Sequence, residues 1–430
     1  MQSLRIAHAF SCWATRIVPK RTMDFARHQA MQWNAAKVGY RRRYRKPMLP
    51  VIENPVSALS PDITPAFEWI DQPQRLAQRL HAWGTPALLA LDTEFIRERT
   101  WYPQLALVQL TIPGQDVLLV DPTATGVAEL LRPLLRDPSV TKLMHSASED
   151  VQALLRGCDA APAPLFDTQI AAALAGVGAG VGYQKLVETQ LGVVLPKSET
   201  RSDWLRRPLS AAQLEYAADD VLHLHALHTL LLEKLRALGR EQWLAEDCAR
   251  LLTQSAQDTP DPYPHLALRS AQYLDAEAQA RLSRLLRWRE AQARAGDRPR
   301  GWILDNELAV TLARKPPIDT HALHAFLDTQ PKAPRRLRAE LWDALASPLT
   351  SEERDIPLAR LPDSGQKQQL RALQDAVAVV ASQLGLPDSV LASRRTLEAL
   401  LEGEDWPKSL QGWRRPLLEP ILAPLLAPKH

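Results

Sequence analysis

Apolar residues recur along this chain in two patterns, short continuous runs and helical spacing, and together they predict an order of elements. Residues 67–83 have helical spacing that ends at a glycine, and Ala87–Phe95 is an apolar run short enough for a buried strand. Two further strands are predicted on either side of the turn signal Pro113-Gly114, at Leu105–Ile112 and Val117–Val120. The three strands should form a meander.

The next part of the pattern alternates helices with strands. The predicted elements are a helix at 128–135, a strand at 142–144, a helix at 148–155, a strand at 164–167 and helices over most of 168–250. One of these helices is expected to carry Tyr216 and to run on to Leu232. Hairpin-linked strands followed by alternating helices and strands predict an α/β domain, with a mixed sheet flanked by helices.

Beyond a linker marked by Pro260, Pro262 and Pro264, every periodic segment has helical spacing. The predicted helices are 274–294, 370–384, 389–401 and 410–426. Trp302–Leu308 and Leu391–Leu397 occupy matching places after a first helix, which indicates a duplicated small helical domain. The predicted boundaries are an extension at 1–60, the α/β domain at 61–258 and two helical domains at 263–350 and 364–428.

The bulk composition limits the class of protein. A chain of 430 residues is too long for one ordinary core. Its three cysteines are scattered without a C-x-x-C pair, so neither a disulfide framework nor a zinc knuckle is indicated. No uncharged apolar run approaches 18 residues, and the chain does not begin with a secretory signal pattern. We therefore expect a soluble, cytoplasmic protein with no membrane partner.

The net charge of +3 conceals an asymmetry along the chain. Residues 1–50 contain 11 Lys and Arg against one acid, whereas residues 51–260 contain 17 against 26 and residues 261–430 contain 24 against 22. An acidic domain can still bind nucleic acid when its acids surround metal ions. The basic extension, including Arg41–Lys46, lacks apolar periodicity and is predicted to be disordered. It is an RNA-binding arm, an Arg-rich transit peptide, or a non-native extension with Met48 or another internal Met as the true start.

Asp92 and Glu94 stand two residues apart in the predicted strand Ala87–Phe95, so their side chains should leave the same face. Two carboxylates about 4 Å apart repel by roughly 4 kcal/mol at an effective dielectric constant of 20. Cations or protonation must offset this repulsion. A solvated surface pair is the alternative reading of this motif alone.

Two further segments contain acids. Asp150 lies near the start of a predicted helix, with Glu149 as the competing candidate, and an acid in that place taken alone is more often a helix cap than a metal site. Tyr216 and Asp220 are one helical turn apart and share a helix face, although an ordinary contact between neighbours is the alternative. A phenol there can orient water while the aspartate binds metal.

Several other features have weaker functional readings. His145 is expected to be structural, and Gly176, Gly178, Gly180 and Gly182 are expected to form a turn between helices rather than a phosphate cradle. Core packing is expected for three aromatic residues that also suit base stacking, which are Phe95, Trp101 and Tyr102. Four cations precede Tyr216 and either meet phosphates or form a solvated face: Lys197, Arg201, Arg206 and Arg207.

Taken together, the acidic segments resemble the DEDD superfamily of 3′–5′ exonucleases, and Tyr216 resembles the tyrosine of its DEDDy branch. The segments Leu-Asp-Thr-Glu-Phe, His-Ser-Ala-Ser-Glu-Asp and Glu-Tyr-Ala-Ala-Asp-Asp-Val are similar to those of the bacterial ribonuclease D family. Pro299-Arg-Gly-Trp-Ile-Leu and Leu391-Ala-Ser-Arg-Arg-Thr-Leu resemble parts of that family's two HRDC domains. The likeness covers about residues 64–428.

The resemblance implies an RNase H-like fold and a quartet of metal ligands, Asp92, Glu94, Asp150 and Asp220, with Tyr216 orienting the nucleophilic water. It implies two divalent ions, Mg²⁺ or Mn²⁺, of which one activates water and the other stabilises the leaving 3′ oxygen. The implied activity is 3′–5′ exoribonuclease trimming of tRNA precursors and other small structured RNAs, with release of nucleoside 5′-monophosphates. The protein is expected to act as a monomer.

Two alternatives remain at the level of sequence. A DNA-directed proofreading exonuclease would share the same acids, because only contacts to the 2′-OH distinguish RNA from DNA. A catalytically silent RNA-binding scaffold would be expected to lack one carboxylate, and all four are present.

Overall fold

The computed structural model describes residues 66–196, 202–403 and 406–426. The predicted basic extension at 1–60 lies outside the described residues. Within the described ranges, no helix is both long enough and apolar enough to cross a lipid bilayer.

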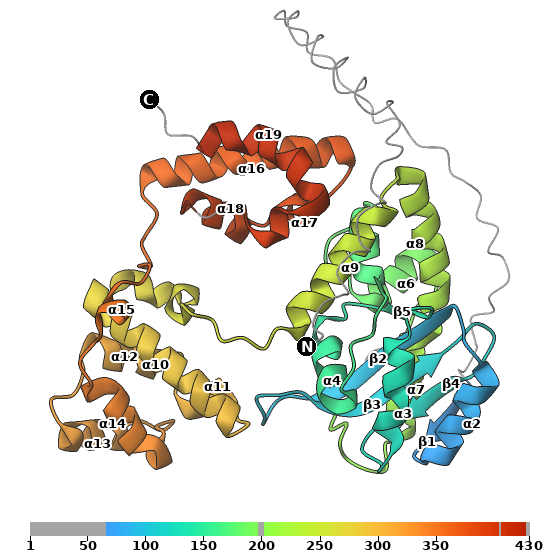
Figure 1. The fold of residues 1–430 in the computed structure, drawn as a ribbon, viewed down its shortest axis with the longest axis horizontal. Helices are drawn as coiled ribbons and strands as arrows, with labels where there is room; N and C mark the ends of the chain where they lie inside the picture. The colour runs from blue at the N-terminus through green and yellow to red at the C-terminus, as the bar shows by residue number, and fades with distance from the viewer. Residues whose placement is uncertain (1–65, 197–201, 404–405, 427–430) are drawn as a thin grey trace, which may run out of the picture. The chain divides into compact units, whose positions relative to one another are not determined.

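A six-stranded sheet in the order β1-β4-β3-β2-β5-β6 forms the centre of the first domain (Figure 1). Its strands are β1 (Phe67–Ile70), β2 (Leu88–Ile96), β3 (Gln104–Thr111), β4 (Val117–Val120), β5 (Thr141–Met144) and β6 (Leu165–Asp167). Strand β3 pairs in antiparallel fashion with both β2 and β4, as the predicted meander requires. Strand β1 pairs in parallel with β4, β5 with β2, and β6 with β5. The predicted α/β class with a mixed sheet is confirmed.

The prediction of one helix over residues 67–83 was wrong. Phe67–Ile70 is the edge strand β1, paired in parallel with β4, and the helix α2 begins only at Pro73. Proline lacks an N–H donor and suits the first turn of a helix, which explains the start of α2. Four residues are too few for periodicity to distinguish a strand from a helical turn.

Helices flank the sheet, and two of them, α4 and α7, both pack against β2 and β3. The helices of this domain are α2 (Pro73–Trp83), α3 (Val127–Arg136), α4 (Ser148–Cys158), α5 (Thr168–Leu174), α6 (Tyr183–Leu191), α7 (Ala211–Leu222), α8 (Leu224–Leu238) and α9 (Glu241–Ala256). The central strand β2 is thus contacted by the two helices that carry the remaining predicted site residues.

The helix predicted to run from Tyr216 to Leu232 is interrupted. Helix α7 ends at Leu222 and α8 begins at Leu224, with His223 between them. The Tyr183 hydroxyl group donates to the Asp219 carbonyl and accepts from the His223 N–H, so it occupies the place of the bond that would continue the helix.

Among the described residues from 264 to 426, all regular elements are helical, as predicted. The first helical domain contains η1 (Pro264–Ala267), η2 (Arg269–Tyr273), α10 (Ala276–Ala295), α11 (Arg300–Ile303), α12 (Asn306–Arg314), α13 (Thr320–Asp328), η3 (Arg335–Leu337), α14 (Arg338–Ala346) and α15 (Ser351–Arg354). The second contains α16 (Ser364–Leu384), α17 (Asp388–Leu391), α18 (Arg394–Leu401), η4 (Lys408–Leu410), η5 (Gly412–Arg414) and α19 (Arg415–Leu426).

The predicted helix at 389–401 is in fact two helices, α17 and α18. Ser393 lies between them and its side chain accepts the Thr396 N–H, which starts α18 afresh. In the first helical domain Asp305 does the same for α12 by accepting the Leu308 N–H. Both helical segments therefore place a four-residue helix before a capped second helix. The duplication itself stays a prediction.

Candidate active site and metal centre

The strand β2 carries Asp92 and Glu94 on one face of the sheet. Asp92 pairs with Gln109 of β3 and Glu94 pairs with Leu107, and the register shifts directly after Glu94. Carboxylate oxygens of Asp92, Glu94 and Asp220 all lie within 4.8 Å of one another. The strand periodicity and the position of α7 together bring these three acids to one point.

The helix α7 supplies Asp220 and Tyr216. A capping box starts the helix, in which the Ser210 side chain accepts the Gln213 N–H and the Gln213 side chain accepts the Ser210 N–H. Tyr216 and Asp220 follow one turn apart, close enough for the phenol and the carboxylate to interact. The helix packs against β2, which aims both side chains at Asp92 and Glu94.

Asp150 approaches the same strand from another helix. It lies in the first turn of α4, and the Thr93 hydroxyl group donates to its Oδ1 atom at 2.5 Å. Asp150 does not belong to the group of three within 4.8 Å, although its charge raises the pKa of Asp92 and of Glu94. The N-cap of α4 is Ala147 and not Asp150, so the sequence alternative of a capping residue does not describe this side chain.

The competing residue Glu149 has different surroundings. Its carboxylate lies 3.6 Å from the Arg97 guanidinium, and its side chain is 64% exposed. The structure therefore separates two neighbouring acids that the sequence left as alternatives, because Asp150 faces β2 and Glu149 forms an ion pair at the surface.

The four acids are half-buried, and their pKa values are raised. Burial is the largest cause in each case, and it raises the pKa of Glu94 to about 9, of Asp220 to about 7 and of Asp150 to about 6. The pKa of Asp92 is raised well above its usual range by burial and then by the charges of Asp150, Asp220 and Glu94. In the described part of the chain, no Lys or Arg forms an ion pair with any of the four.

These observations fit a centre for hard divalent cations. Such cations prefer carboxylate oxygens, and a cation would relieve repulsion that no neighbouring side chain offsets. Gln109, which pairs with Asp92 and is fully buried, has no hydrogen-bond partner in the described structure for either polar atom of its amide. A buried amide without a partner indicates that a polar group is missing beside Asp92. A cation and its bound water would supply that group.

The Tyr216 hydroxyl group is held as a hydrogen-bond donor. Burial and the charges of Asp220 and Glu94 raise its pKa well above the usual value. The Tyr216 ring is backed by the buried Trp204 ring, with centroids 6.0 Å apart. Tyr216 is therefore suited to orient a neighbouring group and unsuited to accept a proton as a phenolate.

Four residues near the acids were assigned no role from the sequence: Thr93, Gln109, Tyr183 and Trp204. Thr93 lies between the two acids of β2, and Trp204 precedes the helix that carries Tyr216. Gln109 is a polar residue inside the apolar run of β3, a signal that could have been noticed. Tyr183 follows the glycine turn and had no distinguishing pattern.

His145 has a structural environment, as expected. Its Nδ1 atom lies 2.9 Å from the Thr168 hydroxyl, and burial lowers its pKa. Of the four cations before Tyr216, Lys197 and Arg201 lie outside the described residues, and Arg206 is exposed. Arg207 instead forms a bidentate ion pair with Asp121, at 2.7 and 2.8 Å.

The three aromatic residues near the site differ in their contacts. Phe95 packs against the core of the domain. The Arg156 guanidinium lies 3.6 Å from the centre of the Tyr102 ring, and the Arg294 guanidinium lies 4.9 Å from that of Trp101. Arginine side chains thus lie over two of the three rings that sequence reasoning considered for base stacking.

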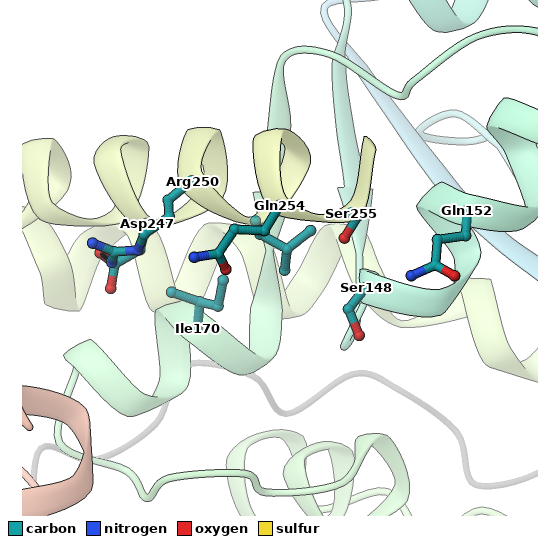
Figure 2. A pocket seen from close by; sticks show the side chains of 8 residues that line it. Ser148, Gln152, Ile170, Asp247, Arg250, Gln254 and Ser255 are labelled. Atoms are coloured by element: carbon teal, nitrogen blue, oxygen red, sulfur yellow. Dashed lines mark hydrogen bonds and ion pairs between the residues drawn. The ribbon is translucent and has the colours of Figure 1, made fainter. Parts of the chain in front are cut away.

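A pocket of about 440 Å³ lies beside the start of α4 (Figure 2). It is lined by Ser148, Gln152, Ile170, Asp247, Arg250, Leu251, Gln254 and Ser255. None of the four acids of the candidate centre lines it. Its carboxylate, Asp247, is already paired with Arg414 at 2.6 and 2.8 Å, so the pocket offers no free charge of its own from that residue.

Comparison with known proteins assigns this arrangement to a family. A family model described as 3′–5′ exonuclease matches residues 67–236. A ribonuclease D of Xanthomonas oryzae pv. oryzae is 54% identical over 358 residues, which cover 83% of this chain and 98% of that protein. A ribonuclease D of Pseudomonas paraeruginosa is 36% identical over 360 residues, with 82% and 95% covered.

Solved structures agree with the sequence comparison. The crystal structure of Escherichia coli RNase D, described as an exoribonuclease involved in structured RNA processing, has a TM-score of 0.75 to this chain at 30% identity. The match covers 84% of this chain and 98% of that one.

Proposed function

The chain belongs to the ribonuclease D family and is a 3′–5′ exoribonuclease, and from this premise we propose which residues perform the reaction. Asp92, Glu94 and Asp220 hold divalent cations, Mg²⁺ or Mn²⁺, and Asp150 completes the ligand set. The observation that carries the proposal is the convergence of three half-buried carboxylates within 4.8 Å of one another. Chance packing would be unfavourable there, because the three charges repel.

Divalent cations at such a site lower the pKa of water and stabilise charge on the leaving oxygen. The protein side chains direct this chemistry. Tyr216, whose phenol stays protonated beside Asp220, orients the attacking water with its hydroxyl group. Thr93 fixes the Asp150 carboxylate by its 2.5 Å hydrogen bond, so that the other carboxylate oxygen stays available. The expected products are nucleoside 5′-monophosphates.

We further propose that the substrates are tRNA precursors and other small structured RNAs, trimmed in the cytoplasm by a monomeric enzyme. The similarity to an enzyme of structured RNA processing supports this substrate class. The two helical domains, at 263–350 and 364–428, are proposed to be HRDC domains that hold the body of the RNA. Their repeated arrangement of a short helix before a capped helix supports a common origin.

The proposal is tested with purified full-length protein and two matched 3′-labelled substrates, a 3′-extended tRNA and a single-stranded DNA of the same extension sequence. Mononucleotides should accumulate from the tRNA only, and only when Mg²⁺ or Mn²⁺ is present. Asp92→Asn should abolish this release, whereas Asp116→Asn, which changes an exposed acid in the β3–β4 turn, should not.

Three results would contradict the proposal. Trimming by Asp92→Asn at the wild-type rate would show that the chemistry lies elsewhere. Equal or faster release from the DNA would favour a DNA-directed exonuclease, and binding of tRNA without hydrolysis would favour an RNA-binding scaffold.

A further inference from the structure

The junction between α7 and α8 contains a side chain inside a backbone hydrogen-bond ladder. In a continuous α-helix the His223 N–H would bond to the Asp219 carbonyl, four residues earlier. The Tyr183 hydroxyl group stands between them instead, 3.1 Å from the Asp219 oxygen and 3.2 Å from the His223 nitrogen. A hydroxyl both donates and accepts, so it can bridge these two groups, whereas a phenylalanine could not.

The bridge lies directly beside a proposed ligand. Asp220 follows Asp219 in the sequence and belongs to the last turn of α7. An inserted hydroxyl ends the regular ladder and lets the chain change direction at His223. Because the side-chain direction of a helical residue depends on the backbone turn that carries it, the bridge fixes the direction in which Asp220 leaves α7.

Tyr183 is itself held from two sides. It is the first residue of α6 and follows a turn in which Gly176, Gly178 and Gly180 have positive φ angles. The Gln169 side chain donates to the Val181 carbonyl at 3.2 Å and anchors this turn. On the other side the His145 ring meets the Tyr183 ring at 62° with centroids 5.6 Å apart. The glycine turn and His145 thus hold the Tyr183 hydroxyl group between Asp219 and His223.

The electrostatic environment agrees with this position. Burial raises the pKa of Tyr183 well above its usual value, and the charges of Asp220 and Asp92 raise it further. The hydroxyl is therefore protonated over the ordinary pH range and can serve as the donor to Asp219.

We propose that Tyr183 is a positioning residue for the exonuclease reaction, acting through the backbone of α7 to aim Asp220 at Asp92 and Glu94. The inference rests on the proposed function, in which Asp220 holds a divalent cation. It extends that function by one residue, because Tyr183 is held by hydrogen bonds to backbone groups on either side of Asp220.

The first test is Tyr183→Phe in the full-length protein. Without the hydroxyl the Asp219 carbonyl and the His223 N–H can bond directly, α7 can run on into α8, and Asp220 is displaced. We expect kcat to fall roughly 10- to 100-fold with the KM for RNA unchanged. Mn²⁺ affinity, measured by calorimetry without RNA, should fall by a similar factor. Unchanged kcat and Mn²⁺ affinity would overturn the proposal.

A matched control removes a hydroxyl that bonds within the β3–β4 turn and makes no bond to α7 or α8. Thr111→Val deletes a hydroxyl that donates to the Ile112 and Gln115 carbonyls in the β3–β4 turn. Both variants should lower the melting temperature, but only Tyr183→Phe should change kcat and Mn²⁺ affinity. Equal kinetic effects in the two variants would show that Tyr183 has only a general structural role.

A second pair of variants keeps the proposal testable if Tyr183→Phe does not fold. At Gly178, φ is +155° and an added Cβ would lie 2.9 Å from the Val181 Cγ2 atom, so Gly178→Ala must shift the turn that delivers Tyr183. Gly182→Ala meets nothing within 4 Å. Gly178→Ala should lower kcat and Mn²⁺ affinity and Gly182→Ala should not. Indistinguishable effects would overturn the proposal.

Whether Tyr183 acts through Asp220 is tested by introducing Tyr183→Phe into the Asp220→Asn protein. If Tyr183 acts through Asp220, Tyr183→Phe should cause no further loss of Mn²⁺ affinity there. A further loss as large as that in the wild-type background would show that Tyr183 does not act through Asp220. These outcomes differ from failure of the proposed function, in which Asp220→Asn itself would retain Mn²⁺ affinity and RNA trimming.

Discussion

The helices α4 and α7 each bring one aspartate to the same strand, but they do so from opposite ends. Asp150 lies in the first turn of α4, whereas Asp220 lies in the last turn of α7. The helix dipole favours negative charge at the start of a helix and opposes it at the end. Asp150 accepts a hydrogen bond from Thr93 of the strand, whereas the neighbour of Asp220 is Tyr216, one turn earlier on its own helix.

Asp150 and Asp220 differ in their surroundings and in their pKa values. Burial is the main cause of the raised pKa of both residues, but the pKa reaches about 7 for Asp220 and only about 6 for Asp150. Asp220 also lies within 4.8 Å of two further acids, while Asp150 is not part of that group. We infer that Asp220 depends more strongly on bound cations than Asp150 does.

The largest effects are expected when Asp220 and Asp150 are replaced one at a time. A unit charge about 4 Å from a partner contributes roughly 4 kcal/mol at an effective dielectric constant of 20, which corresponds to about 1,000-fold in rate. Asp220→Asn should therefore lower kcat/KM by about 1,000-fold or more and also weaken Mn²⁺ binding. Asp150→Asn should lower kcat/KM by about 100-fold, with a smaller loss of Mn²⁺ affinity.

The neighbouring exposed acid provides the control for these measurements. Glu149→Gln removes a charge next to Asp150 but leaves the four acids in place, so its activity should stay within about twofold of wild type. A larger loss of Mn²⁺ affinity in Asp150→Asn than in Asp220→Asn would reverse the inferred order of the two helices.

A smaller effect on kcat is expected when the hydroxyl groups beside the two aspartates are removed. Tyr216→Phe should lower kcat by about 100-fold with little change in KM, because it removes the group that orients water. Thr93→Val should cost only about 10-fold, because Asp150 keeps its place in the first turn of α4. The two effects should be additive when combined, since they act on different helices. Strong non-additivity in steady-state kinetics would show that α4 and α7 position a single shared group.

The last expected effect is a pH dependence of stability in the metal-free protein. The folded pKa values of Glu94, Asp220 and Asp150, about 9, about 7 and about 6, exceed ordinary unfolded values near 4. The folded state therefore binds more protons than the unfolded state between about pH 4 and 9, so these groups make the free energy of unfolding fall as pH rises through that window. A melting series in EDTA from pH 5 to 9 should show the decline.

Added Mg²⁺ or Mn²⁺ should flatten the decline, because bound cations favour the ionised carboxylates. Asp150→Asn should remove part of it below about pH 7, and Glu94→Gln should remove the part that extends towards pH 9. Melting temperatures that rise with pH in EDTA would contradict the raised pKa values of these acids.

Local pattern predicted part of this site. Alternation along β2 placed Asp92 and Glu94 on one face, and helical spacing placed Tyr216 one turn from Asp220. Pattern failed where an element was short or interrupted, as at β1, which was read as a helix, and at His223, where a predicted continuous helix breaks. For Asp150 the spacing alone favoured a helix cap, and its role was suggested by the resemblance to a family.

The sequence by itself determined the class of the fold, the helical tail and the face of each element that carries acids, because periodicity depends on neighbours only a few residues apart. The tertiary structure decided which acids meet. The Thr93 hydroxyl reaches Asp150 across 57 residues of chain, and the Tyr183 hydroxyl reaches Asp219 across 36. Contacts of that separation depend on how helices pack against the sheet, and no local pattern records that packing.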